Sequence, residues 1–277
     1  MRLSLNLNPR KIALALGLIA VLLALQSIYA DHLLFNILGK NGDTVLTRLL
    51  ELFSINTYES VPTWYSIILF FLAASLLAWI ALIGHARSEP HSPYWMGLAL
   101  VFLYISMDKG TTIHEAVSAL LRSVFKASGF FQDVWLILGI SLVIAVGILY
   151  VRFWWRLPGR ARLLFAIAAA VYVGGAAGIE GLSTRQYYLD DGKSFPYLVI
   201  SSIEETVEML GAVVLIYALL DYRHQCEQEL VPRGQARLPA DFSDVQPRWP
   251  LSLRRTAVGF AVLLLLVNGG LLLWSMA

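Results

Sequence analysis

The chain has 277 residues, of which 58% are hydrophobic and only 14% are charged, and its mean hydropathy is +0.66. Soluble domains are far less apolar than this, so the composition excludes an ordinary soluble protein. The formal net charge of +2 is too small to indicate a nucleic-acid partner. Because the apolar residues occur in long blocks, the sequence predicts an integral membrane protein whose main partner is the lipid bilayer.

Seven apolar blocks are long enough to cross a bilayer, which takes about 20 residues of helix. They cover residues 12–30, 64–84, 94–118, 133–152, 162–181, 197–220 and 256–275. None of them alternates polar and apolar residues as barrel strands do, so helices are expected. The predicted fold is an all-α integral membrane protein, a bundle of about seven transmembrane helices.

The distribution of Lys and Arg predicts the orientation. The N-terminal segment, Arg87, residues 151–162 and residues 221–255 together hold 14 of the 21 basic residues, and the alternate connections hold the other seven. Cytoplasmic loops carry the basic excess, so we expect a cytoplasmic N-terminus and a C-terminus outside. The expected location is the plasma (inner) membrane.

Three regions are expected along the chain. Residues 1–222 are predicted to form a six-helix membrane core, 223–255 a polar, proline-containing cytoplasmic linker, and 256–277 the seventh transmembrane helix. Within an outside loop at 31–63, apolar residues at helical spacing predict a short amphipathic helix on the membrane surface (Leu46, Leu49, Leu50 and Phe53).

Two of the predicted helices need a further comment. Residues 1–30 resemble a signal peptide, but the apolar run is long and Ile28 is bulky for a cleavage site, so we expect an uncleaved helix. In the block at 162–181, Ala170, Gly174 and Gly178 recur every four residues, which favours close helix packing. This helix is therefore predicted to be the centre of the bundle.

Acidic residues inside the apolar blocks are the main functional signal. Glu204, Glu205 and Glu208 share one helical arc in the block at 197–220, and Asp108 and Glu115 share one in the block at 94–118, with His114 at its edge. In the predicted topology both groups lie in the outer half of the membrane, and Glu180 closes the outer end of the block at 162–181. Six carboxylates then face one lysine, Lys109, and one histidine.

Such an excess of buried negative charge must be neutralised. Each ion costs about 2.5–3.5 kcal/mol on insertion scales, whereas a protein's total stability is only about 5–15 kcal/mol. The leading hypothesis is a bound divalent metal ion, Zn, Fe, Mn, Mg or Ca, because carboxylates with one imidazole suit these cations. The candidate metal ligands are Asp108, His114, Glu115, Glu180, Glu204, Glu205 and Glu208.

Three functions are compatible with such a cluster. A metal-dependent membrane hydrolase would activate a water for attack on a lipid-borne substrate, with Glu205 or Glu115 as the catalytic base. A proton- or cation-coupled transporter would use Asp108, Lys109 and Glu208, and would need a polar path to the cytoplasmic face. A structural subunit or assembly factor would instead hold these charges in a bonded network, with Lys109 paired to a glutamate.

Overall fold

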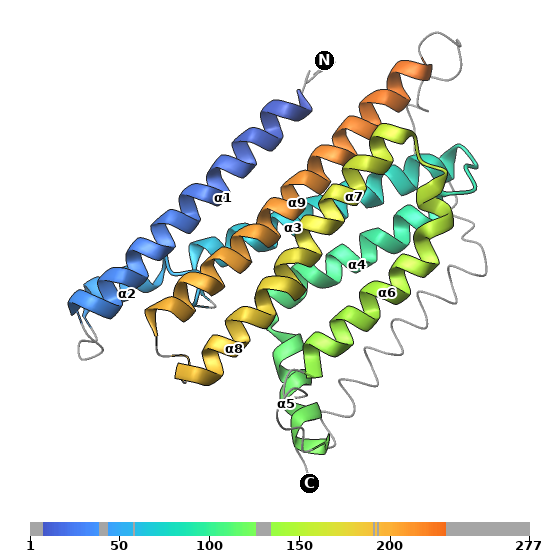
Figure 1. Ribbon diagram of the computed structural model, residues 1–277. Coiled ribbons are helices and arrows are strands. Elements are labelled where there is room, and N and C mark those ends of the chain that lie inside the picture. Colours follow the sequence, from blue (N-terminus) through green and yellow to red (C-terminus); the bar gives the residue numbers. More distant parts are fainter. Residues whose placement is uncertain are drawn as a thin grey trace.

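Figure 1 shows the computed structural model of the chain. The structure describes residues 8–38, 44–57, 59–125, 134–190, 192 and 194–230. Within these ranges the chain consists of helices and short connections and contains no strand. The all-helical prediction is therefore confirmed for the described residues. The predicted seventh helix at 256–277 lies outside them, and so does the predicted linker at 223–255 from residue 231 onward. Residues 223–230, which were expected to belong to this linker, instead continue the last described helix.

The described helices follow the predicted apolar blocks, with two π-helices labelled η. In chain order they are α1 (Pro9–His32), η1 (Leu33–Leu38), α2 (Val45–Glu51), α3 (Val61–Ala86), α4 (Ser92–Thr111), α5 (Ile113–Phe125), α6 (Val134–Trp155), α7 (Gly159–Val173), η3 (Gly174–Ile179), α8 (Glu180–Asp190) and α9 (Phe195–Leu230). The amphipathic helix expected within 31–63 is present as α2, where the Thr44 hydroxyl caps the first turn by accepting the Thr47 N–H at 3.2 Å.

Four of these helical segments are long and apolar enough to cross a membrane: Pro9–Asn36, Val61–Ala86, Leu138–Trp155 and Gly159–Asp190. The other two predicted spans fall on α4 and α9, which are helical but less apolar. Glutamates interrupt α9, and polar residues occupy both ends of α4. The described chain is thus a helical protein with several membrane-spanning candidates.

The predicted continuous helix over 94–118 is wrong at Thr112. This residue has φ 50° and ψ 36°, the left-handed conformation that ends a helix, and it separates α4 from α5. The N–H of Thr112 donates to the carbonyl of Asp108 at 2.7 Å. The uniform helical spacing assumed between Asp108 and Glu115 therefore does not hold.

The centre of the described bundle is α9, rather than the predicted helix at 162–181. Figure 1 shows α9 running between α1 and α7, and it packs against α1, α3, α7, η3 and α8. The predicted helix at 162–181 instead changes to a π-helix at Gly174 and continues as α8. A glycine-rich run has few side chains to hold regular α-helical packing, and π-turns of this kind often occur at functional sites.

Close packing between these helices depends on Gly175 and Gly211. A Cβ atom at Gly211 would lie 2.8 Å from the backbone of Tyr172, and one at Gly175 would lie 3.2 Å from the backbone nitrogen of Glu208. By contrast, Gly174 and Gly178 have nothing within 4 Å of a Cβ. Small residues do bring two helices together here, as expected in lipid. However, the close contacts are made by Gly175 and Gly211, and not by the predicted series Ala170, Gly174 and Gly178.

An apolar core fills the bundle along the part of α9 that follows Glu208. It is formed by buried residues of α3, α4 and α9, including Leu69, Phe70, Leu77, Trp95, Met209, Ile216 and Leu219. No acidic or basic residue occurs in α9 between Glu208 and Asp221, a distance of about 20 Å along the helix. This core separates the acidic segment of α9 from the ion pair between Asp221 and Arg160.

Candidate functional site

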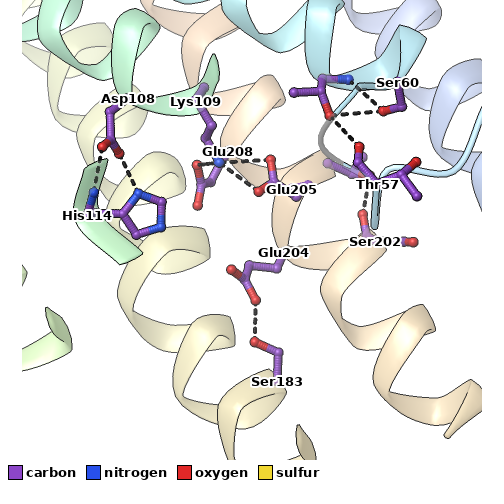
Figure 2. Close-up of polar contacts among 12 residues, drawn as sticks. Thr57, Ser60, Asp108, Lys109, His114, Ser183, Ser202, Glu204, Glu205 and Glu208 are labelled. Atoms are coloured by element: carbon purple, nitrogen blue, oxygen red, sulfur yellow. Dashed lines mark hydrogen bonds and ion pairs between the residues drawn. The ribbon is translucent and has the colours of Figure 1, made fainter. Parts of the chain in front are cut away.

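The ammonium group of Lys109, near the end of α4, contacts two glutamates of α9. Nζ donates hydrogen bonds to Oε1 and Oε2 of Glu205 at 2.7 and 2.8 Å, and it lies 2.8 Å from Oε2 of Glu208 (Figure 2). Glu205 and Glu208 are three residues apart, so they lie on the same face of α9. We call Lys109, Glu205 and Glu208 the Lys109 cluster.

Burial makes the Lys109 cluster energetically important. The side chains of Lys109 and Glu208 are only 14% and 6% exposed, whereas that of Glu205 is 26% exposed. Oε2 of Glu208 is buried, and Nζ of Lys109, 2.8 Å away, is the charged group that it contacts. Removing Lys109 would leave two carboxylates without their cation, and a buried charge left unpaired in this way typically costs about 3–5 kcal/mol.

The π-helix η3 packs directly against this cluster. A Cβ on Gly175 would lie 3.1 Å from Cγ of Glu208 and 3.3 Å from the carbonyl oxygen of Glu204. Gly175 is therefore the residue that lets the backbone of η3 approach the acidic face of α9. Because a larger residue would displace Glu208, the position of this carboxylate depends on the absence of a side chain there.

Glu204 points away from the Lys109 cluster and toward α8. Its Oε2 accepts a short hydrogen bond from the hydroxyl of Ser183, which also contacts the carbonyl of Glu180 at 3.0 Å (Figure 2). Ser183 is buried. Glu204 therefore links α9 to α8. Of the three glutamates expected to share one arc, Glu205 and Glu208 contact Lys109, whereas Glu204 contacts Ser183.

Asp108 and His114 form a separate pair across the break between α4 and α5. Oδ1 of Asp108 accepts the backbone N–H of His114 at 2.9 Å, and Oδ2 lies 2.6 Å from His114 Nδ1 (Figure 2). The carboxylate thus satisfies one of the N–H groups at the start of α5, as a helix cap does. The sequence placed these two residues on one continuous helix, whereas in the structure they belong to different helices and meet across the break.

The remaining predicted ligands are placed less centrally. Glu115 is exposed on α5, and Glu180 is half-buried at the start of α8. Among the described residues, no group of three or more His, Cys, Asp or Glu side chains is arranged to hold a metal ion. The structure consequently gives no support to the predicted metal site. Two of the predicted ligands, Glu205 and Glu208, are instead paired with Lys109.

A second polar network lies at the end of the bundle where α1 finishes, and the sequence did not indicate it. The buried carboxylate of Asp31 accepts hydrogen bonds from the Ser54 hydroxyl at 2.6 Å and from Nδ2 of Asn56 at 2.8 Å. Asn56 Nδ2 also reaches the Leu198 carbonyl at 3.3 Å, and Ser27 accepts the N–H of Ile55 at 2.8 Å. The connection before α3 is thereby tied to both α1 and α9.

Residues 13–222 match a protein family described as a domain of unknown function, DUF8692. The match covers well over half of the chain, so the protein belongs to this family. No curated protein and no solved structure matches the chain. The matched range contains every candidate site residue described above and both polar networks.

Proposed function

We propose that the protein is a membrane-embedded structural subunit or assembly factor. Its intramembrane charges form a bonded network that fixes the packing of the bundle. The observation that carries this proposal is the position of Lys109 Nζ between Glu205 and Glu208. A cation of the protein itself stands where a bound ion would be needed. The cluster therefore connects α4 to α9 without an external ligand.

The other polar groups have the same connecting character. Asp108 bonds to His114 across the break between α4 and α5, and Glu204 bonds to Ser183 between α9 and α8. One excess negative charge remains where Glu205 and Glu208 share a single ammonium. A proton held between these carboxyl groups would balance it, which is a common arrangement for two carboxylates in one site.

A proton- or cation-coupled transporter has less support. Such a carrier would need a polar path inward from the cluster, whereas the residues of α9 beyond Glu208 pack into the apolar core. The direct test is proton flux. In liposomes with an imposed pH gradient and a pH-sensitive dye, the proposal expects the same leak with and without the protein. A leak that the Glu208→Gln variant abolishes would favour the transporter.

The metal-dependent hydrolase acting on a lipid-borne substrate stays a prediction, with Glu205 or Glu115 as its base and a divalent metal as its cofactor. Elemental analysis of the full chain, purified in mild detergent without chelator, tests it. Our proposal expects no stoichiometric metal in the parent protein or in the folded Glu208→Gln variant. Stoichiometric metal in the parent that is lost from the folded variant would contradict the structural role and support the enzyme.

The proposed setting is the plasma (inner) membrane, with the N-terminus and the α6–α7 connection on the cytoplasmic side. The distribution of basic residues supports this orientation. Arg10, Lys11 and Arg160 lie near the start of α1 and the start of α7, which Figure 1 shows at the same end of the bundle as the end of α9. In this orientation the Lys109 cluster lies in the outer half of the bilayer.

A further inference from the structure

The connection between α6 and α7 lies at a membrane surface whichever way the protein is oriented. Two candidate spans, Leu138–Trp155 and Gly159–Asp190, are separated by only Arg156, Leu157 and Pro158. A turn this short between two crossing helices must sit at the level of the lipid headgroups. Four arginines lie in or beside this turn: Arg152, Arg156, Arg160 and Arg162.

The guanidinium of Arg162 is held against two tryptophans. Its Cζ lies 5.7 Å from the ring centre of Trp154 and 5.1 Å from that of Trp155, and Nε1 of Trp154 donates to the Arg162 carbonyl at 3.0 Å. Contacts of this kind favour a cation over an aromatic face. Trp155 remains 60% exposed, as expected of an aromatic residue at the membrane interface.

The arginines differ in whether their charge is already balanced. Arg160 donates to both carboxylate oxygens of Asp221, at 2.8 and 2.9 Å, and to the Tyr217 hydroxyl at 3.1 Å. Arg152, Arg156 and Arg162 form no ion pair with any residue that the structure describes. Arg152 is exposed on α6, whose apolar side chains are also largely exposed, and Arg156 is exposed in the turn that follows. This turn therefore presents uncompensated positive charge beside a lipid-facing helix.

We propose that the α6–α7 connection binds the phosphate group of an anionic phospholipid, with Arg156 and Arg162 as the anchoring residues and Trp155 packing beside the headgroup. Guanidinium groups bind phosphate through paired N–H donors, which makes arginine better suited than lysine to this ligand. The tryptophans restrict Arg162 before the lipid arrives, so less side-chain freedom is lost on binding. This inference is independent of the role proposed for the Lys109 cluster.

The test is lipid binding to the full-length protein in detergent, measured by native mass spectrometry. The protein is titrated with phosphatidylglycerol, with phosphatidylcholine of the same acyl chains, and with inorganic phosphate as a soluble competitor. The variants are Arg156→Gln and Arg162→Gln, alone and together. Arg185→Gln is the matched control, because it removes one exposed arginine from α8, at the far end of the same candidate span.

The proposal expects preferential binding of phosphatidylglycerol, weakened about fivefold by each substitution and about 25-fold by both, with no change for Arg185→Gln. Equal binding of the two lipids, or unchanged binding by Arg156→Gln, would overturn it. Displacement of phosphatidylglycerol by an equal concentration of phosphate would instead assign the site to a soluble anion. Arg156 is exposed, so its variant decides the question even if Arg162→Gln fails to fold.

Discussion

Nζ of Lys109 lies 2.8 Å from Oε2 of Glu208, and this ion pair joins the end of α4 to the middle of α9. The same ammonium donates to both carboxylate oxygens of Glu205. One positive charge is thus shared by two acidic side chains in a buried position. Neutralising one acid should therefore cost less stability than neutralising the lysine. After loss of one acid the lysine still has the other as its partner, whereas loss of the lysine leaves both acids unpaired.

The Glu208→Gln variant is expected to fold, with a free energy of unfolding within about 1 kcal/mol of the parent. The substitution leaves Lys109 paired one-to-one with Glu205, which retains its two hydrogen bonds. Titration with a denaturing detergent, followed by circular dichroism, measures the change. A loss of several kcal/mol would mean that Glu208 is charged in the folded protein, contrary to the proton-sharing arrangement.

Gly211→Ala should destabilise the protein by about 1–3 kcal/mol, the usual range for overpacking a tight contact. The added Cβ would lie 2.8 Å from the backbone of Tyr172, so α7 and α9 must separate. The control is Gly178→Ala, which meets nothing within 4 Å and should be neutral or slightly stabilising because alanine favours a helix. Equal effects of the two substitutions would show that these helices do not meet at Gly211.

Asp31→Ala should loosen the connection that precedes α3. It leaves the buried Ser54 hydroxyl without its acceptor and removes one of the acceptors of the Asn56 amide, at a cost of about 1–3 kcal/mol for the unsatisfied hydroxyl. Faster limited proteolysis within residues 52–60 is the expected result. The exposed Glu59, in the same connection, provides the control substitution Glu59→Ala. If both variants were cleaved at the parental rate, Asp31 would not be holding this segment.

His114→Ala should release α5 while leaving the main bundle intact. The imidazole contact with Asp108 Oδ2 at 2.6 Å spans the left-handed break at Thr112, so its loss removes a tether between α4 and α5. Hydrogen exchange measured by mass spectrometry should become faster in 113–125 and remain unchanged in α9. The exposed neighbour Glu115 provides the control Glu115→Ala. Faster exchange throughout α9 would instead show that His114 supports the whole bundle.

Hydrophobic block length was sufficient to predict where most helices lie, because a bilayer-spanning helix needs a long apolar run. It could not predict where helices break. The break at Thr112 accompanies the capping of α5 by the Asp108 carboxylate, and the π-helix at Gly174–Ile179 lies where Gly175 closely approaches α9. The spacing of apolar residues within one segment is insensitive to both features.

The candidate site could be predicted only in part, because sequence spacing describes one helix and not its contacts with other helices. Helical spacing correctly placed Glu205 and Glu208 together on α9. The contact between Asp108 and His114 instead crosses the break at Thr112, where helical spacing fails. Helical spacing also could not show that Lys109 would point toward the glutamates rather than away from them. The hydrogen-bonding partners of Asp31 are 23 and 25 residues away in sequence. No local pattern connects such residues, and only the folded chain does.

The most direct test of the proposed structural role compares the unfolding free energies of Lys109→Met and of the triple variant Lys109→Met, Glu205→Gln, Glu208→Gln. The single substitution strands two buried carboxylates and should cost about 3–5 kcal/mol, whereas neutralising all three members should restore most of that loss. A triple variant as unstable as the single one, or a Lys109→Met variant as stable as the parent, would contradict the claim that the Lys109 cluster holds α4 to α9.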